Sequence, residues 1–463
     1  MTSLSVGLTI VCMKFERRGY ETRAVADIRI ALAHHRRVVA VGPTGCGKTV
    51  VAALLIKQLP KLSVLFVAHK YELVDQAHGR LADHGIRAGV IMAHDEAVHG
   101  TDRVDPSARV QVASIQTVIR RGGPKRVDLI IVDEAHRIIA DSYQDLIACH
   151  PNAMVLGLTA TPQRMDGKPL GDFFHHMVTI ARPSELYKAG YLAQPDIWAA
   201  PKDATAELVE RARGAKIGKG DYTPKSVAKI VNSKTLIGKV VSEAIRLAPG
   251  VAKVVFAGSV EHSMQLRDRF RHAGIQAAHL DANTDPHERA LMLSDLRSGA
   301  IEVVCNFGVL TEGWDLPELG AVIIARPTRS KTLLFQMAGR VQRPYRGLKP
   351  VILDHGNCCI ALGIDPRDDY PWNLEGADRG GGESIVKSCA ECLAIIPGGC
   401  TVCPSCGAEQ PKTDRQEAEE IEAKLVELER GRMAALRERV EAMAREKGAP
   451  KGWVQKVMRE MRV

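Results

Sequence analysis

One short segment, GPTGCGKT at residues 42–49, constrains the fold of this chain more than any other. It follows the apolar run 37–41 and opens a helical stretch that extends to Gln58, so it is a glycine-rich turn between a strand and a helix. Glycines allow the backbone N–H groups of such a turn to point inward, and the helix N-terminus adds a dipole that favours a bound phosphate. We therefore predict a nucleotide-phosphate site formed by Gly42, Thr44, Gly45, Cys46, Gly47, Lys48 and Thr49.

Two side chains of this loop have distinct expected roles. Lys48 is expected to neutralise the β- and γ-phosphates of a nucleotide, and Thr49 is expected to bind Mg²⁺. The sequence therefore predicts Mg²⁺ together with ATP.

The same first part of the chain contains further short apolar runs that alternate with helical stretches. These candidate strands are residues 37–41, 63–68, 110–114, 127–132 and 154–159. Their nearly continuous apolarity is typical of parallel strands buried on both faces. Strands that alternate with helices form a doubly wound α/β sheet with right-handed crossovers.

An acidic pair follows one of these strands. The run 127–132 leads directly into Asp133, Glu134, Ala135 and His136. Carboxylates at the C-terminal end of a buried parallel strand lie where open α/β sheets bind ligands. Asp133 is expected to hold Mg²⁺ through water, and Glu134 to orient or activate the attacking water. His136 either couples the nucleotide to the Thr-Ala-Thr segment at 159–161 or caps the turn.

The strand pattern starts again in the second half of the chain, at residues 253–257, 302–306, 321–325 and 350–354. The chain is therefore predicted to contain two α/β domains in tandem, with a break between about 185 and 245. Residues 201–221 are charged and glycine-containing, which indicates a helix followed by an exposed loop. Gly380–Gly382 marks a second break.

A cluster of cysteines follows this second break. Cys389-x2-Cys392 and Cys403-x2-Cys406 are paired knuckles whose four thiolates suit a closed, tetrahedral, structural Zn²⁺ site. Cys400 leaves a second pairing open, because Cys400-x2-Cys403 has the same spacing. From Thr413 the chain is a charged helical tail, either a solvated amphipathic helix or a basic arm that includes Lys451, Lys456 and Arg459.

The overall composition is that of a globular protein with a modest excess of positive charge. Its formal net charge is +9 and its isoelectric point is near 9.0, which suits a polyanionic partner. A chain of 463 residues needs no disulfide staples, so its 11 cysteines favour a reducing, cytoplasmic compartment. Residues 2–13 are weakly apolar but too short to span a bilayer, so no membrane association is expected; Met13 is an alternative start.

Four motifs occur in an order that resembles the superfamily-two helicases. They are the phosphate loop, Asp-Glu-Ala-His at 133–136, Thr-Ala-Thr at 159–161 and Gln336-x2-Gly339-Arg340-x2-Arg343. Within that superfamily the chain resembles the bacterial RadD (YejH) DNA-repair helicases. The segments that carry the closer match are VLFVAHKYELVDQ (64–76), LIIVDEAHRI (129–138), GLTATPQR (157–164), GVLTEGWDLP (308–317), RPTRSKTLLFQMAGRVQRP (326–344) and VILDHGN (351–357).

This resemblance implies two RecA-like domains with ATP in the cleft between them. Arg340 and Arg343 would then act as arginine fingers, and Gln336 would position water or sense the γ-phosphate. Gly313 and Asp315 would line the nucleotide from the second domain. The implied divisions are an N-terminal lead (1–12), RecA-like domain 1 (13–185), a connection (186–245), RecA-like domain 2 (246–375), a zinc ribbon (383–410) and the charged helical tail (411–463).

The chain departs from the family at the element that reads adenine. Such helicases often have Arg-x-Tyr-Gln before the phosphate loop, whereas here the residues are Arg18, Gly19, Tyr20 and Glu21. A carboxylate accepts a hydrogen bond from the adenine amino group but donates to N7 only when protonated. ATP remains the expected nucleotide, with relaxed selectivity for the base. Tyr20 either stacks on the base or belongs to the core.

The resemblance also implies a path for a nucleic-acid strand across both domains. The matching positions are His69, Lys70, Ser114, Gln116, Thr117, Ser259 and Thr311. Small hydroxyls, amides and backbone N–H groups suit phosphate contacts that do not read sequence. Aromatic residues make up only 4% of the chain, which argues against an extended base-stacking platform, and Trp314 is assigned to packing.

The sequence thus predicts an ATP-dependent helicase or translocase that acts on single-stranded or branched DNA in repair, recombination or replication. Three alternatives stay open. They are a double-strand translocase of a restriction or remodelling complex, an RNA helicase, and an ATP-switched adaptor that docks a single-strand-binding protein. Phosphate contacts alone do not separate DNA from RNA.

Overall fold

The computed structural model describes residues 18–93, 103–164, 169–218, 220–375, 386–411 and 441. The chain divides into two compact units, the first made of residues 1–388 and 393–395 and the second of residues 389–392 and 396–463. The predicted lead at 1–12 lies outside the described residues, as does the predicted tail apart from Pro411 and Glu441.

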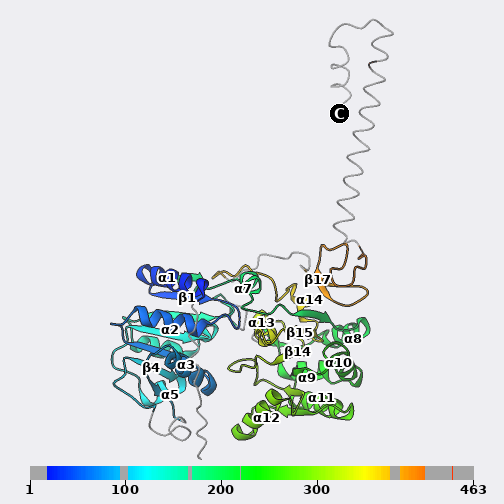
Figure 1. Ribbon diagram of the computed structural model, residues 1–463, viewed down its shortest axis with the longest axis horizontal. Helices are drawn as coiled ribbons and strands as arrows, with labels where there is room; N and C mark the ends of the chain where they lie inside the picture. The colour runs from blue at the N-terminus through cyan, green and yellow to red at the C-terminus, as the bar shows by residue number, and fades with distance from the viewer. Residues whose placement is uncertain are drawn as a thin grey trace, which may run out of the picture. The chain divides into compact units, whose positions relative to one another are not determined.

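The first sheet of the larger unit is fully parallel and has seven strands (Figure 1). In spatial order these are β3 (Ala88–Ile91), β4 (Val110–Ser114), β2 (Val64–Ala68), β5 (Leu129–Asp133), β6 (Met154–Thr159), β1 (Arg37–Val41) and β7 (His176–Thr179). The five interior strands are rich in Val, Ile and Leu, and almost all of their residues are buried, as expected for strands covered on both faces.

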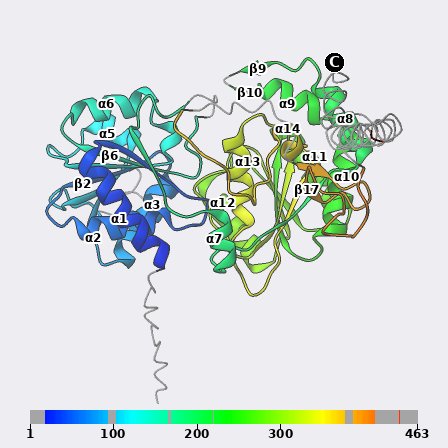
Figure 2. The ribbon, with the colours of Figure 1, turned by 90° about the horizontal axis from the view of Figure 1, so that it is seen from above.

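Helices cover both faces of this sheet (Figure 2). On one face lie α1 (Gly19–His34), α2 (Lys48–Gln58) and α3 (Tyr71–Asp83), whose apolar residues join one core with the strands. On the other lie α5 (Ile115–Arg121) and α6 (Asp141–Cys149), which belong to a second core. A 3₁₀ turn, η1 (Ala135–Arg137), follows β5, and a short helix, α7 (Pro183–Lys188), follows β7.

The second sheet of the larger unit is also fully parallel and has six strands. In spatial order these are β12 (Ala277–Leu280), β13 (Val303–Asn306), β11 (Ala252–Ala257), β14 (Leu319–Ala325), β15 (Val351–Asp354) and β8 (Asp196–Ala199). Helices α10 (Lys234–Leu247) and α11 (Val260–His272) pack on one face. Helices α12 (Pro286–Ser298), α13 (Lys331–Ala338) and α14 (Cys358–Leu362) pack on the other, and a 3₁₀ turn, η2 (Gly339–Val341), follows α13.

The segment predicted to be a connection contributes to this second sheet. Strand β8 lies within 186–245, yet it pairs with β15 and forms an edge of the sheet. Between β8 and α10 the chain forms α8 (Lys202–Ala212), a small hairpin of β9 (Ile217–Gly218) and β10 (Asp221–Tyr222), and α9 (Pro224–Val231). These helices share a small core of their own.

The smaller unit contains the cysteine knuckles. Two short strands, β16 (Val386–Ser388) and β17 (Ile395–Pro397), pair with each other and flank the first knuckle in sequence. The prediction of two tandem parallel α/β domains followed by a cysteine-bearing module is confirmed. Across the part of the chain that the structure describes, no helix has the length and apolarity needed to cross a membrane.

Candidate nucleotide site and nucleic-acid surface

The phosphate loop connects β1 to α2 in a conformation that only glycines adopt easily. Gly45 has a φ of 86° and Gly47 a φ of 80°, both in the left-handed region. Gly47 is the N-cap of α2, and no side chain in the described part of the chain caps the helix, so its first N–H groups face the loop without such an acceptor. The Lys48 ammonium donates to the carbonyl oxygens of Gly42 (3.1 Å) and Pro43 (3.3 Å), which holds it over the same loop.

The two carboxylates at the end of β5 lie in different electrostatic surroundings. Desolvation, together with the negative charge of Glu134, raises the pKa of Asp133 to about 7. Burial acts to raise the pKa of Glu134 as well, but the contact of its Oε2 with His136 Nδ1, at 3.3 Å, lowers it overall. Glu134 has a φ of 52°, so the backbone turns sharply at this residue, and its N–H donates to Asp133 Oδ1.

The second domain approaches the phosphate loop through the end of α13. A β-carbon placed on Gly339 would lie 2.5 Å from Thr44 Cβ, so only glycine permits this close approach. Arg343 forms an ion pair with Asp315, and its Nε would lie 3.6 Å from a β-carbon on Gly45. The structure therefore brings Arg343 and Asp315 beside the loop.

The neighbouring arginine is held differently. The guanidinium of Arg340 donates to the carbonyl oxygens of Trp314 (2.5 Å) and Thr311 (2.7 Å), and its buried Nε has no hydrogen-bond partner among the described residues. Desolvation lowers the pKa of Arg340. The indole of Trp314 is packed in the core of the second domain, as the sequence indicated.

Gly313 lies against helix α3 of the first domain. Its carbonyl accepts a hydrogen bond from Gln76 Nε2 at 3.0 Å, and a β-carbon on it would lie 3.4 Å from Leu73 Cγ. Its φ of 74° again requires a glycine. These contacts place Gly313 at the surface between the two domains, and its place beside the nucleotide remains a prediction.

The element expected to read the base lies next to the phosphate loop. Tyr20 is 4% exposed, and its hydroxyl donates to the carbonyl of Cys46 at 2.8 Å, so the structure favours the core alternative for this ring. A β-carbon on Gly47 would lie 3.3 Å from Glu21 Oε1, and burial raises the pKa of Glu21. The Arg18 guanidinium stacks on the ring of Tyr191, 4.3 Å from its centroid.

One carboxylate that the sequence analysis did not single out stands at the centre of this region. Glu312, in the loop after β13, is 3% exposed and contacts residues of both domains. Its partners are His69, Lys70, His136, Arg137 and Gln336. The signal available in the sequence was one of two carboxylates, with Asp315 the other, inside the mostly apolar and glycine-containing segment GVLTEGWDLP.

The first-domain residues predicted to contact nucleic acid form two groups. Ser114 Oγ donates to Gln116 Oε1 (2.7 Å), and Gln116 Nε2 donates to the carbonyl of His69 (3.2 Å), so these three lie together, with Lys70 adjacent in sequence. Thr117 is buried, and its Oγ1 accepts from the N–H of Ala93 at 3.3 Å. The Thr117 hydroxyl is therefore hydrogen-bonded within the first domain.

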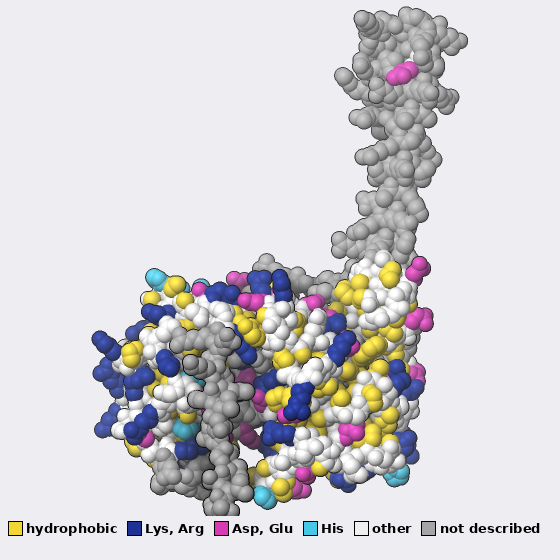
Figure 3. Space-filling view, in the orientation of Figure 1, with side chains coloured by type: hydrophobic (Ala, Val, Ile, Leu, Met, Phe, Trp, Pro, Cys, Tyr) yellow, Lys and Arg dark blue, Asp and Glu magenta, His cyan; other side chains and the backbone are white. Residues whose placement is uncertain are grey.

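In the second domain Ser259 caps α11, because its Oγ accepts from the N–H of His262 at 3.0 Å. Thr311 accepts from Arg340 through its carbonyl. On the face drawn in Figure 3, Lys and Arg side chains gather along the outer edge of the first domain, which suits a polyanion.

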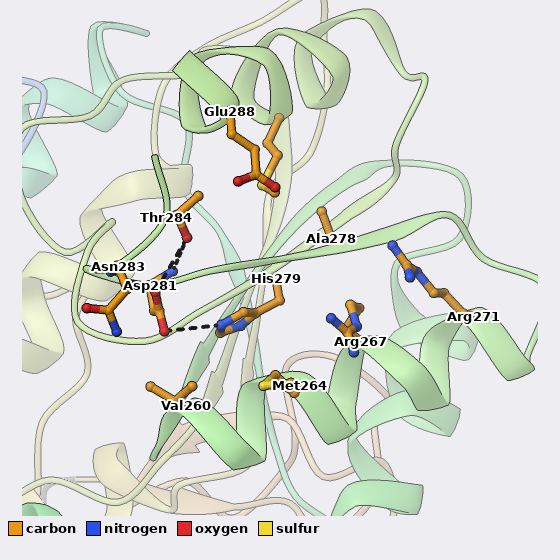
Figure 4. Close-up of a pocket in the computed structure, with 11 residues that line it drawn as sticks. Val260, Met264, Arg267, Arg271, Ala278, His279, Asp281, Asn283, Thr284 and Glu288 are labelled. Carbon is orange, nitrogen blue, oxygen red and sulfur yellow. Dashed lines mark hydrogen bonds and ion pairs between the residues drawn. The ribbon is translucent and has the colours of Figure 1, made fainter. Parts of the chain in front are cut away.

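A cavity of about 430 Å³ lies beside α11, the helix that Ser259 caps (Figure 4). Arg267 and Arg271 face it from α11, and Glu288 points into it from α12. His279 lies 3.4 Å from Asp281 at its base. The cavity thus combines two guanidinium groups with acidic neighbours at the edge strand β12.

The four predicted zinc ligands gather in the smaller unit. The sulfur atoms of Cys389, Cys392, Cys403 and Cys406 all lie within 4.8 Å of one another. The Cys389–Cys406 and Cys392–Cys403 sulfur distances are 3.7 and 3.8 Å. Zn–S bonds of about 2.3 Å in a tetrahedron place sulfurs about 3.8 Å apart, so these thiols fit Zn²⁺. Cys400 does not belong to this group of four.

The environment of the cysteine cluster favours thiolate at one ligand. Burial acts to raise the pKa of Cys389, but backbone N–H groups of Cys392 and Glu391 lower it to about 6. Gln410 Nε2 also donates to Cys389 Sγ at 3.2 Å and so orients this sulfur from outside the cluster.

Two family models match the two α/β domains separately. Residues 14–164 match the family described as the res subunit of type III restriction enzymes, and residues 238–345 match the helicase conserved C-terminal domain. The two matches cover the phosphate loop, the acidic pair and the arginines.

Individual proteins are similar over most of the chain. A 51.5 kDa protein of Lactococcus phage 7-9 is 30% identical over 406 residues, which are 86% of this chain and 84% of that protein. The DNA 3′-5′ translocase XPB2 of Sulfurisphaera tokodaii is 23% identical over 376 residues, 73% of this chain and 81% of that protein. IRC3 of Saccharomyces cerevisiae, named as a candidate ATP-dependent helicase, is 26% identical over 377 residues; the match covers 73% of this chain but about half (52%) of IRC3.

Among solved structures, the ATP-dependent type ISP restriction-modification enzyme LlaBIII bound to DNA is similar in fold. Its TM-score is 0.53 at 17% sequence identity, over 73% of this chain and 27% of that enzyme. At this identity the similarity concerns the fold alone.

Proposed function

This chain belongs to superfamily two of the helicases and is an ATP-hydrolysing enzyme of the helicase or translocase type, and we propose that it couples hydrolysis of Mg²⁺-ATP in the cleft between its two α/β domains to movement along DNA. The observation that carries the proposal is the close approach of the two domains at the phosphate loop. Gly339 of the second domain lies against Thr44, and Arg343 lies beside Gly45.

In this mechanism the first domain binds the nucleotide. The N–H groups of the loop and the Lys48 ammonium would hold the phosphates, and Thr49 and Asp133 would hold Mg²⁺, which would neutralise charge on the phosphates. Glu21 lies beside Gly47, where it accepts from the adenine amino group.

The reacting water is oriented by Glu134, whose lowered pKa keeps it ionised at neutral pH. The water oxygen forms a bond to the γ-phosphorus, the bond from that phosphorus to the β–γ bridging oxygen breaks, and ADP leaves. Glu134 accepts the water proton. Arg340 and Arg343 exchange their present acceptors for the γ-phosphate oxygens, where negative charge develops, and Gln336 helps to position the water.

The strand runs across both domains. We assign phosphate contacts to His69, Lys70, Ser114 and Gln116 of the first domain and to Ser259 and Thr311 of the second. Thr117 is left out of this assignment, because its buried hydroxyl accepts from the N–H of Ala93 within the domain. Arg267 and Arg271, which line the cavity beside α11, extend this path with two positive charges.

A role in DNA repair or recombination, as in the RadD branch, is the cellular setting that we propose. A second candidate is a duplex translocase that does not separate strands. It is favoured by the match to the res subunit of type III restriction enzymes and by the similarity to XPB2, which is named as a translocase. Strand displacement without triplex displacement supports the first candidate, and the reverse supports the second.

For the cysteine module we propose a structural Zn²⁺ bound by Cys389, Cys392, Cys403 and Cys406. The module would dock a protein partner such as a single-strand-binding protein. About one zinc per chain is expected by elemental analysis of the purified protein. A protein that is folded and zinc-free would contradict this assignment.

The test of the main proposal is ATP hydrolysis measured with single-stranded, duplex, forked and branched DNA and with RNA. We expect stimulation by DNA, strongest with single-stranded or branched forms. Lys48→Ala and Glu134→Gln are expected to abolish the stimulated activity, whereas Lys239→Ala, on the surface helix α10, should leave it intact. Wild-type turnover in either active-site variant would refute the mechanism. Hydrolysis that no nucleic acid stimulates would favour an ATP-switched adaptor, and stimulation by RNA alone an RNA helicase.

A further inference from the structure

Glu312 is a buried carboxylate whose surroundings are unusually rich in cations and donors. It lies in the loop after β13 of the second domain and is 3% exposed. A buried carboxylate is costly unless it is paired and hydrogen-bonded. The identity of its partners therefore indicates what this charge is for.

Four partners of Glu312 come from the first domain. His69 Nε2 lies 2.8 Å from Oε2, Arg137 Nη2 lies 3.1 Å from both oxygens, His136 Nε2 lies 3.5 Å from Oε1, and Lys70 Nζ lies 4.0 Å from Oε2. The positive charge around it holds the pKa of Glu312 far below its usual range despite the burial that opposes this. The carboxylate is thus ionised and bridges the two domains.

The fifth partner comes from its own domain. Gln336 Nε2 donates to Glu312 Oε1 at 3.1 Å. Gln336 lies on α13, the helix whose end approaches the phosphate loop. Glu312 therefore also connects to the helix that leads into the segment with Arg340 and Arg343.

These contacts form a continuous chain between two loops of the first domain, which follow the neighbouring parallel strands β2 and β5. Glu134 Oε2 lies 3.3 Å from His136 Nδ1, and the other nitrogen of the same ring faces Glu312. Glu312 in turn contacts His69, whose carbonyl accepts from Gln116. The chain therefore runs from the carboxylate assigned to the attacking water to the loop assigned to the nucleic acid.

We propose that Glu312 is the positioning residue that couples nucleic-acid binding to ATP hydrolysis, by holding His69 and His136 on one carboxylate when the two domains close. This inference rests on the proposed function, because it presumes that the Glu134 end binds nucleotide and the His69 end binds nucleic acid. Glu312 belongs to the second domain and its charged partners to the first, so the link exists only in the closed arrangement.

The physical basis is the geometry of a shared acceptor. Nucleic acid that orders the loop at His69 and Lys70 favours the Glu312 contacts and hence closure. Closure brings the Glu312 carboxylate into contact with His136. This contact fixes the orientation of the imidazole ring, whose other nitrogen contacts Glu134. Binding free energies coupled in this way are reciprocal, so nucleotide must strengthen nucleic-acid binding by the same factor.

The test compares Glu312→Gln, Glu312→Asp and a control, Glu318→Gln, in the full chain. Glu318 lies six residues further along the same loop region and contacts Arg297 at 3.9 Å, on the surface of the second domain. Two quantities are measured: the factor by which single-stranded DNA stimulates ATP hydrolysis, and the change in DNA affinity that a non-hydrolysable ATP analogue produces. Binding of the analogue without DNA and the thermal unfolding midpoint are recorded for each variant.

For Glu312→Gln we expect both factors to fall about tenfold or more, toward one, with analogue binding in the absence of DNA unchanged. Glu312→Asp keeps the charge but withdraws it by one methylene, so its factors should be intermediate. Glu318→Gln should match wild type. If Glu312→Gln fails to fold, the Asp variant decides the outcome.

Wild-type stimulation in both Glu312 variants would overturn the inference and leave the proposed function standing. Loss of analogue binding itself would also overturn it, because Glu312 would then be part of the nucleotide site or of the fold. If DNA and RNA fail to stimulate the wild-type protein, the proposed function falls, and this inference falls with it.

Discussion

The two α/β domains use the same connection for opposite purposes. In the first, β1 leads through Gly47 into α2, and no side chain caps that helix. In the second, β11 leads through Ser259 into α11, and the Ser259 hydroxyl accepts from the N–H of His262. A helix N-terminus without a side-chain cap is available for phosphate, whereas a capped one is already satisfied. At this equivalent connection the N-cap residue therefore differs between the two domains, in the sense expected if only the first binds phosphate.

The two domains also differ in the sign of the charge that they present to the site. The first sheet ends in the carboxylates of Asp133 and Glu134, which suit Mg²⁺ and water, whereas the second domain supplies the guanidinium groups of Arg340 and Arg343. Neither set suffices for phosphoryl transfer, which needs both a positioned nucleophile and positive charge at the γ-phosphate. Under the proposed function the site is divided between the two domains, so we expect hydrolysis to depend on their approach.

The largest effect is expected when a positive charge is removed from the second domain alone. Arg343→Ala is expected to lower the maximal rate of DNA-stimulated ATP hydrolysis by about 10³-fold, the magnitude typical of an arginine finger. ATP affinity should change little, since the phosphate loop is intact. The measurement is steady-state hydrolysis with saturating DNA, together with binding of a fluorescent ATP analogue.

Arg346→Ala is the matched control for this prediction. Arg346 is exposed and stacks on Tyr345, with its guanidinium 5.1 Å from the ring centroid. Its removal should leave turnover unchanged. An Arg343→Ala variant that hydrolyses ATP at the wild-type rate would show that the first domain supplies the catalytic charge by itself.

A second test uses two buried histidines with opposite pKa shifts. Burial lowers the pKa of His262 in the second domain to about 4. Although burial opposes ionisation of His136 in the first domain, contacts with Glu134 and Glu312 raise its pKa to about 9. His262 is therefore neutral in the folded protein at neutral pH, and His136 is charged.

These shifts predict opposite pH dependences of the free energy of unfolding. Below pH 6.5 the unfolded chain takes up a proton at His262 that the folded chain refuses until about pH 4, so stability falls by up to about 3 kcal/mol as the pH drops through this window. The contribution of His136 is complete below pH 6.5 and is lost as the pH rises through 9. Denaturant unfolding of wild type, His262→Gln and His136→Gln between pH 4.5 and 9.5, a range of about five units, measures both.

His262→Gln should flatten the acid side of the stability curve and leave the alkaline side unchanged. His136→Gln should do the reverse. Equal acid sensitivity in wild type and His262→Gln would assign that sensitivity to another group, of which buried His355, with its pKa lowered to about 4, is the first to examine.

The strands that the sequence predicts and those that it misses differ in one physical respect. The nine predicted strands correspond to the nine interior strands of the two sheets. Within these two sheets the strands that were missed are β3, β7, β12 and β8, the outer strands of each sheet; the short pairs β9–β10 and β16–β17 outside them were not predicted either. Each outer strand is four residues long, and β7, His176–Thr179, has only one buried residue. Continuous apolarity identifies strands covered on both faces, and edge strands lack that signal.

The candidate site follows a similar rule. The phosphate loop and the acidic pair were found because their chemistry is local in sequence. Glu312 was missed because its meaning arises from His69, Arg137 and Gln336, which lie 243, 175 and 24 residues away in sequence. A single buried carboxylate has no spacing to detect, and only the folded arrangement gathers its partners.

The smallest test returns to the two N-caps. Ser259→Ala removes the hydroxyl that accepts from His262 and should lower the stability of the second domain by about 1 kcal/mol, with ATP affinity unchanged. Gly47→Ala adds a β-carbon at a φ of 80° and 3.3 Å from Glu21 Oε1. This costs a similar amount, about 1 kcal/mol, in backbone strain, and it also crowds the phosphate cradle. Both variants should therefore lose stability in unfolding measurements, but only Gly47→Ala should also lose affinity for ATP. Weakened ATP binding in Ser259→Ala would mean that the cap of α11 also serves the nucleotide site.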